Sequence, residues 1–225
     1  SIGGKVAVDH PMGKNLVGSF YQPELVLADV QLLTTLPRRE LTAGWVETIK
    51  HGLILDADLF RFMDVQADAL LSLDPQFVER AVVWSATVKA WVVSEDERET
   101  GGRRTLLNYG HTIGHGIEAA TGFERFLHGE AIAIGMMGAA SLSQRLGLID
   151  AEVVEEQRRV LEKFCLPVTC YDVDRDAVLK AMQLDKKVKD KAIRWVLLDE
   201  LGEAVVRSDV SVTDVADVLG ELGVG

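Results

Sequence analysis

Three of the five histidines and one glutamate are the residues best suited to chemistry in this chain. His111 and His115 stand four residues apart, which places them on one face of a helix, and His128 follows soon after. Two helices packed antiparallel would bring His128 back towards His111, and Glu47 offers a carboxylate from an earlier segment. Neutral imidazoles and a carboxylate suit zinc, and three protein ligands leave a position open for substrate. Taken alone, the spacing is equally open to the interpretation that these are ordinary core or surface histidines.

A zinc protease is the first alternative to consider for paired histidines. That class needs the sequence His-Glu-x-x-His, in which the glutamate acts as general base. Here the residues between His111 and His115 are Thr112, Ile113 and Gly114. The protease interpretation therefore fails on its main requirement.

Cationic side chains accompany this candidate centre. Arg104 precedes the first of these histidines by about two helical turns, and Lys50 follows Glu47 at the spacing of one turn. Lys89 interrupts the apolar stretch 82–93, where it either extends to solvent or serves a site. A lysine cluster late in the chain and a glycine-rich loop at its start add further positive charge. These groups either form solvated turns or bind an anionic substrate with phosphate and carboxylate groups.

Composition narrows the class of protein. The chain has 225 residues, of which 48% are hydrophobic, and a formal net charge of −11. This charge argues against nucleic acid or an anionic membrane as the main partner, and no apolar stretch reaches the roughly 18 residues of a membrane span. Two cysteines, Cys165 and Cys170, do not make a disulfide framework. We therefore expect an acidic, soluble, cytoplasmic protein.

Helical periodicity predominates after residue 36. The predicted helices cover Arg39–Leu55, Phe77–Ser94, Leu106–Thr121, Glu130–Leu146, a segment that Asp150 begins and Leu166-Pro167 ends, and a terminal segment over Val212–Leu222. Two short runs, Ile193–Leu198 and Ala204–Arg207, predict a β-hairpin.

The first 35 residues differ from the rest. They predict a turn at Pro11–Asn15 and a short strand at Leu25–Val30, which needs neighbouring strands to be stable. We expect residues 1–35 to be the remnant of a larger N-terminal domain and residues 36–225 to form a helical domain.

Longer motifs carry a resemblance to a known family. In chain order they are Gly3–Lys5, His10–Asn15, Phe20–Pro23, Thr35–Glu40, Glu47–Gly52, Asp96–Glu99, Leu106–His115, His128–Glu130 and Asp185–Lys187. Their order and spacing resemble the dehydroquinate synthase family of the shikimate pathway over essentially the whole chain. The resemblance implies a mainly α fold, the C-terminal helical domain of that family. It also implies short N-terminal strands left from an α/β NAD-binding domain and a small β-hairpin near the C-terminus.

The activity implied by this resemblance is that of an NAD- and metal-dependent lyase. Such enzymes convert 3-deoxy-D-arabino-heptulosonate 7-phosphate, a phosphorylated keto acid, to 3-dehydroquinate and phosphate. The implied steps are oxidation, phosphate elimination, reduction, ring opening and intramolecular aldol closure. Zinc or cobalt is the implied metal, and a homodimer is the implied assembly. Nothing here matches the glycine-rich loop that cradles the NAD pyrophosphate, so we expect an incomplete enzyme.

The resemblance also implies roles for individual residues. It assigns the metal to Glu47, His111 and His128. It assigns catalysis and substrate binding to Lys5, Asn15, Lys50, Lys89, Arg104, Asn108, His115 and Lys186, with Lys187 as an alternative to Lys186. Within this set, Lys89 and Arg104 match positions around the substrate carboxylate. NAD contacts are assigned to Lys14, Thr35, Leu36 and Glu40.

Two alternatives remain beside this interpretation. A cyclase of the epi-valiolone type would share the metal site and the NAD chemistry but would act on a substrate that lacks the carboxylate. A folded fragment that binds metal without turning over any substrate is the second alternative.

Overall fold

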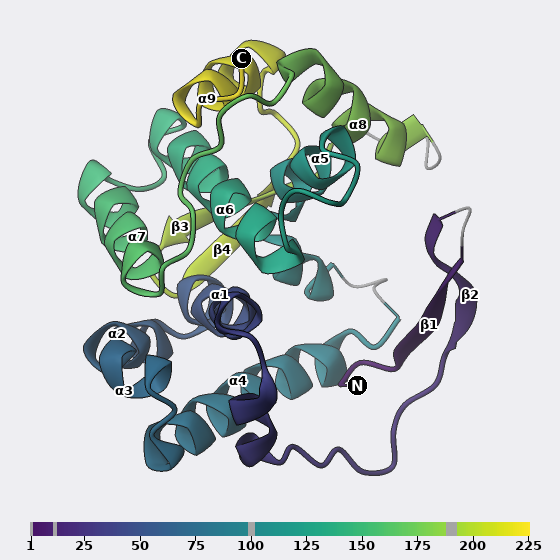
Figure 1. Cartoon of the computed structure of the whole chain (residues 1–225). Coiled ribbons are helices and arrows are strands. Elements are labelled where there is room, and N and C mark those ends of the chain that lie inside the picture. The colour runs from purple at the N-terminus through teal and green to yellow at the C-terminus, as the bar shows by residue number, and fades with distance from the viewer. Residues whose placement is uncertain (1, 11–12, 99–101, 188–192) are drawn as a thin grey trace.

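The computed structural model of the chain describes residues 2–10, 13–98, 102–187 and 193–225, with side chains described except at 9–10, 13–16 and 184–187. The described part is mainly helical, with two separate two-stranded antiparallel sheets. Figure 1 shows the first sheet standing off from the helical body as an arm, whereas the second lies within that body. The fold class expected from the sequence is confirmed.

The N-terminal arm consists of strands β1 (Lys5–His10) and β2 (Gly13–Phe20), followed by an extended segment and the 3-10 helix η1 (Val30–Thr35). Of the turn predicted over Pro11–Asn15, Pro11 and Met12 lie outside the described residues, and Gly13–Asn15 already belong to β2. The strand predicted over Leu25–Val30 is wrong. Among the described residues no strand lies beside this segment, so its backbone has no partner for a sheet ladder.

The helical body is built from nine α-helices among the described residues, one 3-10 helix and a hairpin. Their bounds are α1 (Arg38–Leu55), α2 (Ala57–Val65), α3 (Ala67–Leu71), α4 (Pro75–Glu95), η2 (Arg104–Asn108), α5 (His111–Ala120), α6 (His128–Arg145), α7 (Ala151–Lys163), α8 (Arg175–Lys187), β3 (Trp195–Glu200), β4 (Glu203–Arg207) and α9 (Val212–Glu221). Most predicted helices and the hairpin are confirmed close to their predicted bounds. Helices α2, α3 and α8 were not predicted, and α7 ends before the predicted Leu166-Pro167.

One predicted helix, Leu106–Thr121, is instead two elements. Gly110 adopts a left-handed conformation with φ of 77°, which glycine reaches without the steric penalty of a side chain. Gly110 is the N-cap of α5, so η2 ends at Asn108 and α5 begins at His111. The break therefore sets the position of a candidate metal ligand.

Helices α1 and α6 lie at the centre of the body, and α5 packs on α6 (Figure 1). Their facing side chains, among them Ile49, Leu53, Ile113, Ile132 and Met136, are almost fully buried and form one core. Burial of this apolar surface is the main force that holds the three helices together. In the ranges the structure describes, no helix is long and apolar enough to cross a membrane.

Two glycines let the backbones of these helices touch. A Cβ atom added at Gly129 of α6 would lie 2.0 Å from the carbonyl oxygen of Ala43 in α1. One added at Gly135 would lie 2.1 Å from the carbonyl oxygen of Gly110. Neither distance is sterically allowed, so α6 approaches both neighbours only because these residues have no side chain.

Candidate metal centre and substrate site

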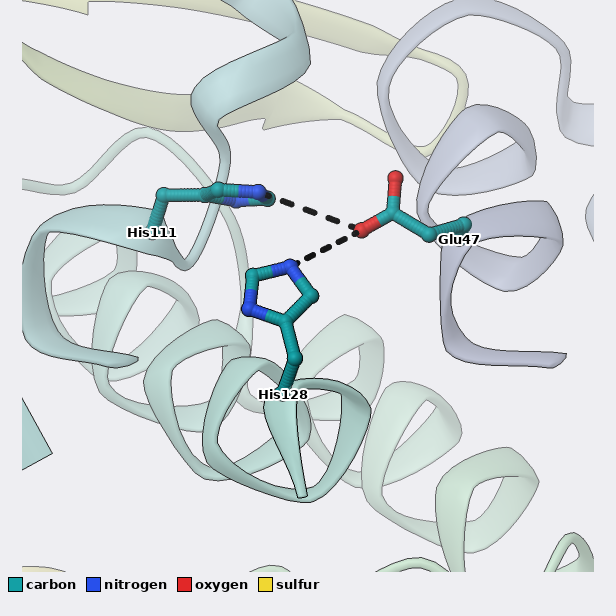
Figure 2. A group of neighbouring side chains, drawn as sticks. All are labelled: Glu47, His111 and His128. Carbon is teal, nitrogen blue, oxygen red and sulfur yellow. Dashed lines mark ion pairs between the residues drawn. The ribbon is translucent and has the colours of Figure 1, made fainter. Parts of the chain in front are cut away.

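The centre of the candidate site is a carboxylate that faces two imidazoles (Figure 2). Oε1 of Glu47 in α1 lies 3.9 Å from Nε2 of His111 and 4.0 Å from Nε2 of His128. One ligand atom from each of the three side chains lies within 4.8 Å of the other two. These separations are too long for hydrogen bonds. They are slightly longer than the separation of two donor atoms that each lie about 2.0–2.2 Å from one tetrahedral ion, so a small movement of the side chains would bring them to one ion.

Local sequence signals place both histidines at helix starts. His111 is the first residue of α5 after the left-handed Gly110. His128 is the first residue of α6, where the Glu130 side chain accepts a hydrogen bond from the Leu127 backbone N–H at 2.9 Å. Such a contact caps the helix start, because it satisfies a backbone donor that has no partner within the helix. The helix starts thus fix where the two imidazoles project.

Hydrogen bonding orients the ring of His111. Its Nδ1 lies 3.1 Å from the backbone carbonyl oxygen of Tyr109. A carbonyl oxygen only accepts, so Nδ1 carries the proton and the lone pair of Nε2 faces Glu47. Burial is the main reason that the pKa of His111 falls to about 3, which keeps the imidazole neutral. A neutral imidazole is the form that binds a metal ion.

Lys50 holds the other oxygen of the carboxylate. Its Nζ donates to Oε2 of Glu47 at 2.6 Å, and the lysine side chain is 2% exposed. Burial raises the pKa of Glu47, but the Lys50 ammonium and the neighbouring imidazoles outweigh that effect and lower the pKa to about 2. The carboxylate is therefore ionised at neutral pH.

The environment of the Glu47 carboxylate is a further observation that supports a divalent ion at this group of side chains. Oε1 of Glu47 is buried and has no hydrogen-bond partner among the described residues. A buried carboxylate oxygen without a partner carries a large desolvation cost. An ion bound between this oxygen, His111 and His128 would remove that cost, and one carboxylate with two neutral imidazoles is a donor set that zinc accepts.

Three further predicted residues lie around this centre. His115 is exposed on α5, with its ring centroid 5.2 Å from that of His111 and 5.9 Å from that of His128. Lys89 is half-buried on α4, and its positive charge helps to lower the pKa of Lys50, after burial as the main cause. Asn108 is exposed at the end of η2, three residues before His111. The structure thus brings His115 and Lys89 to the region of the candidate centre, whereas Asn108 is related to it by its place in the chain.

Arg104 is placed differently from the free guanidinium that a substrate site suggests. It is buried, and it donates to the carbonyl oxygens of Glu97 at 2.7 Å and Gly3 at 2.9 Å. Its own backbone N–H donates to Asp96. Arg104 therefore joins the N-terminal arm to the helical body, whatever else it binds.

The remaining predicted residues lie towards the arm or outside the described side chains. Lys5 is exposed on β1, and Thr35, Leu36 and Glu40 are exposed where η1 leads into α1. The side chains of Lys14, Asn15, Lys186 and Lys187 lie outside the described residues. The backbones of Lys14 and Asn15 belong to β2, and those of Lys186 and Lys187 to the last residues of α8. These two lysines of the late cluster therefore lie in a helix and not in a solvated turn.

Sequence reasoning missed one charged residue beside the metal group. Glu118 of α5 is 4% exposed, and both of its carboxylate oxygens lie 3.4 Å from Nδ1 of His128. The signal in the sequence is a lone carboxylate in the small and apolar stretch 116–120, because buried charges are rarely left unpaired.

Comparison with known families and proteins agrees along nearly the whole chain. The description "3-dehydroquinate synthase N-terminal" matches residues 1–43, and "3-dehydroquinate synthase C-terminal" matches residues 44–188. A 3-dehydroquinate synthase from Nitrosomonas europaea is 51% identical over 204 residues, covering 91% of this chain and 55% of that protein. Another, from Thermodesulfovibrio yellowstonii, is 45% identical over 222 residues, covering 98% of this chain and 62% of that protein.

Solved structures show the same fold. A 2-epi-5-epi-valiolone synthase from Streptomyces hygroscopicus subsp. jinggangensis, with NAD+ and Zn2+ bound, superposes with a TM-score of 0.87 at 25% identity, covering 98% of this chain and 61% of that one. A 2-deoxy-scyllo-inosose synthase complexed with carbaglucose-6-phosphate, NAD+ and Co2+ gives a TM-score of 0.80 at 31% identity, covering 96% and 61%.

The chain spans 55% of the first of these curated relatives and 62% of the second. The C-terminal family description alone covers residues 44–188, which is more than half of the 225 residues. On this evidence the chain belongs to the 3-dehydroquinate synthase family.

Proposed function

We propose that this chain forms the metal- and substrate-binding part of a 3-dehydroquinate synthase, a lyase that converts 3-deoxy-D-arabino-heptulosonate 7-phosphate to 3-dehydroquinate and phosphate. The observation that carries the proposal is the group of Glu47, His111 and His128 around a buried carboxylate oxygen that has no hydrogen-bond partner among the described residues. The Zn2+ and Co2+ named for two solved cyclases of this fold support the same interpretation.

The ligand residues are prepared for an ion before it binds. Lys50 keeps Glu47 ionised, and the bond from His111 to the Tyr109 carbonyl turns Nε2 towards the same oxygen. A zinc or cobalt ion held there would act as a Lewis acid towards a substrate hydroxyl. NAD would supply the oxidant for that hydroxyl and the reductant for the later step.

The surrounding groups are suited to an anionic, polyhydroxylated substrate. The exposed imidazole of His115 lies beside both metal-site histidines, where it can hydrogen-bond a substrate oxygen and exchange a proton with it. Lys89 and Arg104 are the proposed partners of the substrate carboxylate. Around the phosphate and the reacting hydroxyls we place Lys5, Asn15, Asn108 and Lys186.

The N-terminal arm is the proposed contribution of this chain to cofactor binding. Lys14, Thr35, Leu36 and Glu40 would contact NAD, which requires further protein around the arm. In this scheme residues 1–35 belong to the NAD-binding domain and residues 36–225 form the metal- and substrate-binding domain. A cytoplasmic homodimer completes the proposal.

A cyclase of the epi-valiolone type is the second candidate, because the valiolone synthase superposes with a TM-score of 0.87. Identity of 51% to a dehydroquinate synthase, against 25% to the valiolone synthase, favours the first candidate. The two differ in whether the substrate carries a carboxylate. Binding of the heptulosonate phosphate, compared with an analogue whose carboxylate is replaced by a hydroxymethyl group, distinguishes them.

The first test is zinc content per chain, measured on protein purified without chelator. We expect close to one zinc in the wild-type chain, little in Glu47→Gln and His111→Ala, and wild-type content in His115→Ala, which alters a neighbouring histidine outside the ligand set. Full zinc content in both ligand variants would contradict the metal assignment. Phosphate release from the heptulosonate phosphate with NAD present then separates an active chain from a metal-binding fragment.

A further inference from the structure

Glu118 and Glu47 face opposite nitrogens of one imidazole. Nε2 of His128 lies 4.0 Å from Oε1 of Glu47, whereas Nδ1 of the same ring lies 3.4 Å from both carboxylate oxygens of Glu118. The Glu118 side chain is 5% exposed and comes from α5, the helix that also carries His111. A buried carboxylate thus lies directly behind a candidate metal ligand.

The protonation pattern of the ring follows from this arrangement. A carboxylate accepts hydrogen bonds, so the Nδ1 that faces Glu118 is the nitrogen that carries the proton. The lone pair then lies on Nε2, on the side of Glu47. His111 shows the same division, with Nδ1 towards the Tyr109 carbonyl and Nε2 towards Glu47. Both imidazoles are therefore held by an acceptor behind the ring.

We propose that Glu118 is a positioning residue for the metal centre: it fixes the tautomer and the ring orientation of His128, and so raises the affinity of the site for a divalent ion. The inference rests on the proposed function, since it takes Glu47, His111 and His128 as the ligands. Acceptors behind metal-ligating histidines orient the ring and increase its basicity, and their loss costs about 10–100-fold in metal affinity.

A second donor set makes a competing prediction. One ligand atom from each of His115, Glu118 and His128 also lies within 4.8 Å of the other two. In this set Glu118 contacts Nδ1 of His128 at 3.4 Å and Nε2 of His115 at 4.0 Å. In that arrangement Glu118 would be a ligand and Nδ1 of His128 would bind the ion. The buried Oε1 of Glu47, which has no hydrogen-bond partner among the described residues, favours the first set, because only that set uses it.

Cobalt(II) titration of the whole chain, followed by visible absorption, tests the proposal without an activity assay. We expect Glu118→Gln to raise the cobalt dissociation constant about 10–100-fold and to alter the ligand-field bands. Glu124→Gln, which changes an exposed carboxylate in the loop after α5, serves as the control and should bind as the wild type does. Thermal unfolding of the metal-free variants shows whether each one is folded.

The outcomes separate this inference from the proposed function. If Glu118→Gln binds cobalt with wild-type affinity and spectrum, the positioning role is overturned while the metal site stands. If His115→Ala abolishes binding and Glu47→Gln retains it, Glu118 is a ligand and the inference is wrong. If the wild-type chain binds no ion, the proposed function and the inference fail together.

A second measurement covers the case in which Glu118→Gln does not fold. Nitrogen-15 NMR of the zinc-loaded wild-type chain reports which imidazole nitrogen carries the proton, with His128 assigned by comparison with His128→Gln. We expect a protonated Nδ1 and a metal-bound Nε2. The reverse pattern would overturn the proposal.

Discussion

The buried ammonium of Lys50 makes the charge balance of the metal site depend on whether an ion is bound. Without an ion, Lys50 is the partner of Glu47 at 2.6 Å, and the second oxygen of that carboxylate faces the neutral imidazole of His111. With an ion, the carboxylate gains a second positive neighbour. The same lysine therefore stabilises the empty site more than the filled one.

We expect Lys50→Met to lower the free energy of unfolding by about 1–3 kcal/mol in the presence of a chelator, because it leaves the ionised Glu47 without its hydrogen-bonded partner. The loss should be smaller when zinc is present. Chemical denaturation with chelator and with zinc measures both values, and Lys180→Met, on the exposed side of α8, is the control. An equal loss under both conditions would contradict this account.

At the scale of single residues, spacing predicted the candidate metal centre only in part. The interval between His111 and His115 is the helical signal, yet His115 is not in the group that contains Glu47. That group depends on contacts between α1, α5 and α6, which the spacing of residues along one helix does not encode. Glu47 was an available carboxylate from an earlier segment, and the family motifs then assigned it to the metal. Glu118 was not singled out from the sequence, and its shorter contact is to His128 of the next helix.

At the scale of elements, the ligand group depends on how closely three helices approach. Gly129 follows His128 and touches the backbone of α1, while Gly135 touches the residue that precedes His111. These contacts bring the starts of α5 and α6 to the middle of α1. The positions of the imidazoles relative to Glu47 are thus set by backbone contacts rather than by the ligands themselves.

Gly135→Ala should therefore damage both stability and metal binding. Its methyl group would lie 2.1 Å from the Gly110 carbonyl oxygen, so the helices must separate, at a cost of about 1–3 kcal/mol. Zinc affinity should fall as well, since His111 moves with α5. Gly44→Ala in α1, where an added Cβ meets nothing within 4 Å, is the matched control and should stabilise the helix by about 0.5–1 kcal/mol. Isothermal titration and thermal unfolding measure the two effects.

A second element-scale contact joins α2 to α7. Asp64 accepts from Arg159 through both carboxylate oxygens, at 2.6 and 3.0 Å, and also pairs with Lys163. Hydrogen bonds from Arg159 are the main cause that lowers the pKa of Asp64, and burial opposes it. Because the pKa of Asp64 is lower in the folded chain than in the unfolded chain, the ionised carboxylate stabilises the fold at pH values above its ordinary pKa. This stabilisation is lost as the pH falls from the ordinary pKa through the lowered one.

Asp64→Asn should lower the free energy of unfolding by about 1 kcal/mol at neutral pH, a modest value because the basic partners are largely exposed. The difference from the wild type should shrink as the pH falls below the ordinary carboxyl range. Urea denaturation across this range measures it. Asp58→Asn, which removes an exposed pair within α2, should change stability less.

The helices that the sequence predicted are those with long apolar stripes, such as α1, α4 and α6. The short helices α2 and α3 were missed because their region is of mixed polarity and gives no long apolar stripe. Asp56 begins α2, and Gln66 separates α2 from α3. The break at Gly110 was missed because a glycine within a helical pattern does not reveal a left-handed conformation. The periodicity of the sequence was therefore enough to predict that a helix exists. The positions of the breaks depend on helix caps and tertiary contacts, which periodicity does not reveal.

At the scale of the whole molecule, the arm differs from the body in what it exposes. Apolar side chains that are more than half exposed lie along the arm and the segment after it: Val8, Val17, Phe20, Tyr21, Leu25 and Leu27. Arg104 ties the base of this arm to the body through Gly3. The chain therefore presents an apolar surface on an arm that is anchored to the helical body.

Replacing Phe20 and Leu27 together by serine should reduce the fluorescence of an apolar dye such as anilinonaphthalene sulfonate bound to the wild-type chain, because it removes two of the most exposed apolar groups. Zinc content should not change. Val212→Ser, at the exposed start of α9, is the control and should leave dye binding nearly unchanged. Equal dye binding by the double variant and the wild type would contradict the expectation.

The glycine contacts of α6 also bear on how such a chain can diversify. The valiolone synthase keeps this fold at 25% identity, so most positions tolerate replacement. Gly129 and Gly135 do not have that freedom, since any side chain there meets a neighbouring backbone. Sequences of this fold can therefore change at many positions only if these two remain glycine. Replacements elsewhere would then leave the spacing of Glu47, His111 and His128, the proposed metal ligands, as it is, because that spacing depends on these two backbone contacts.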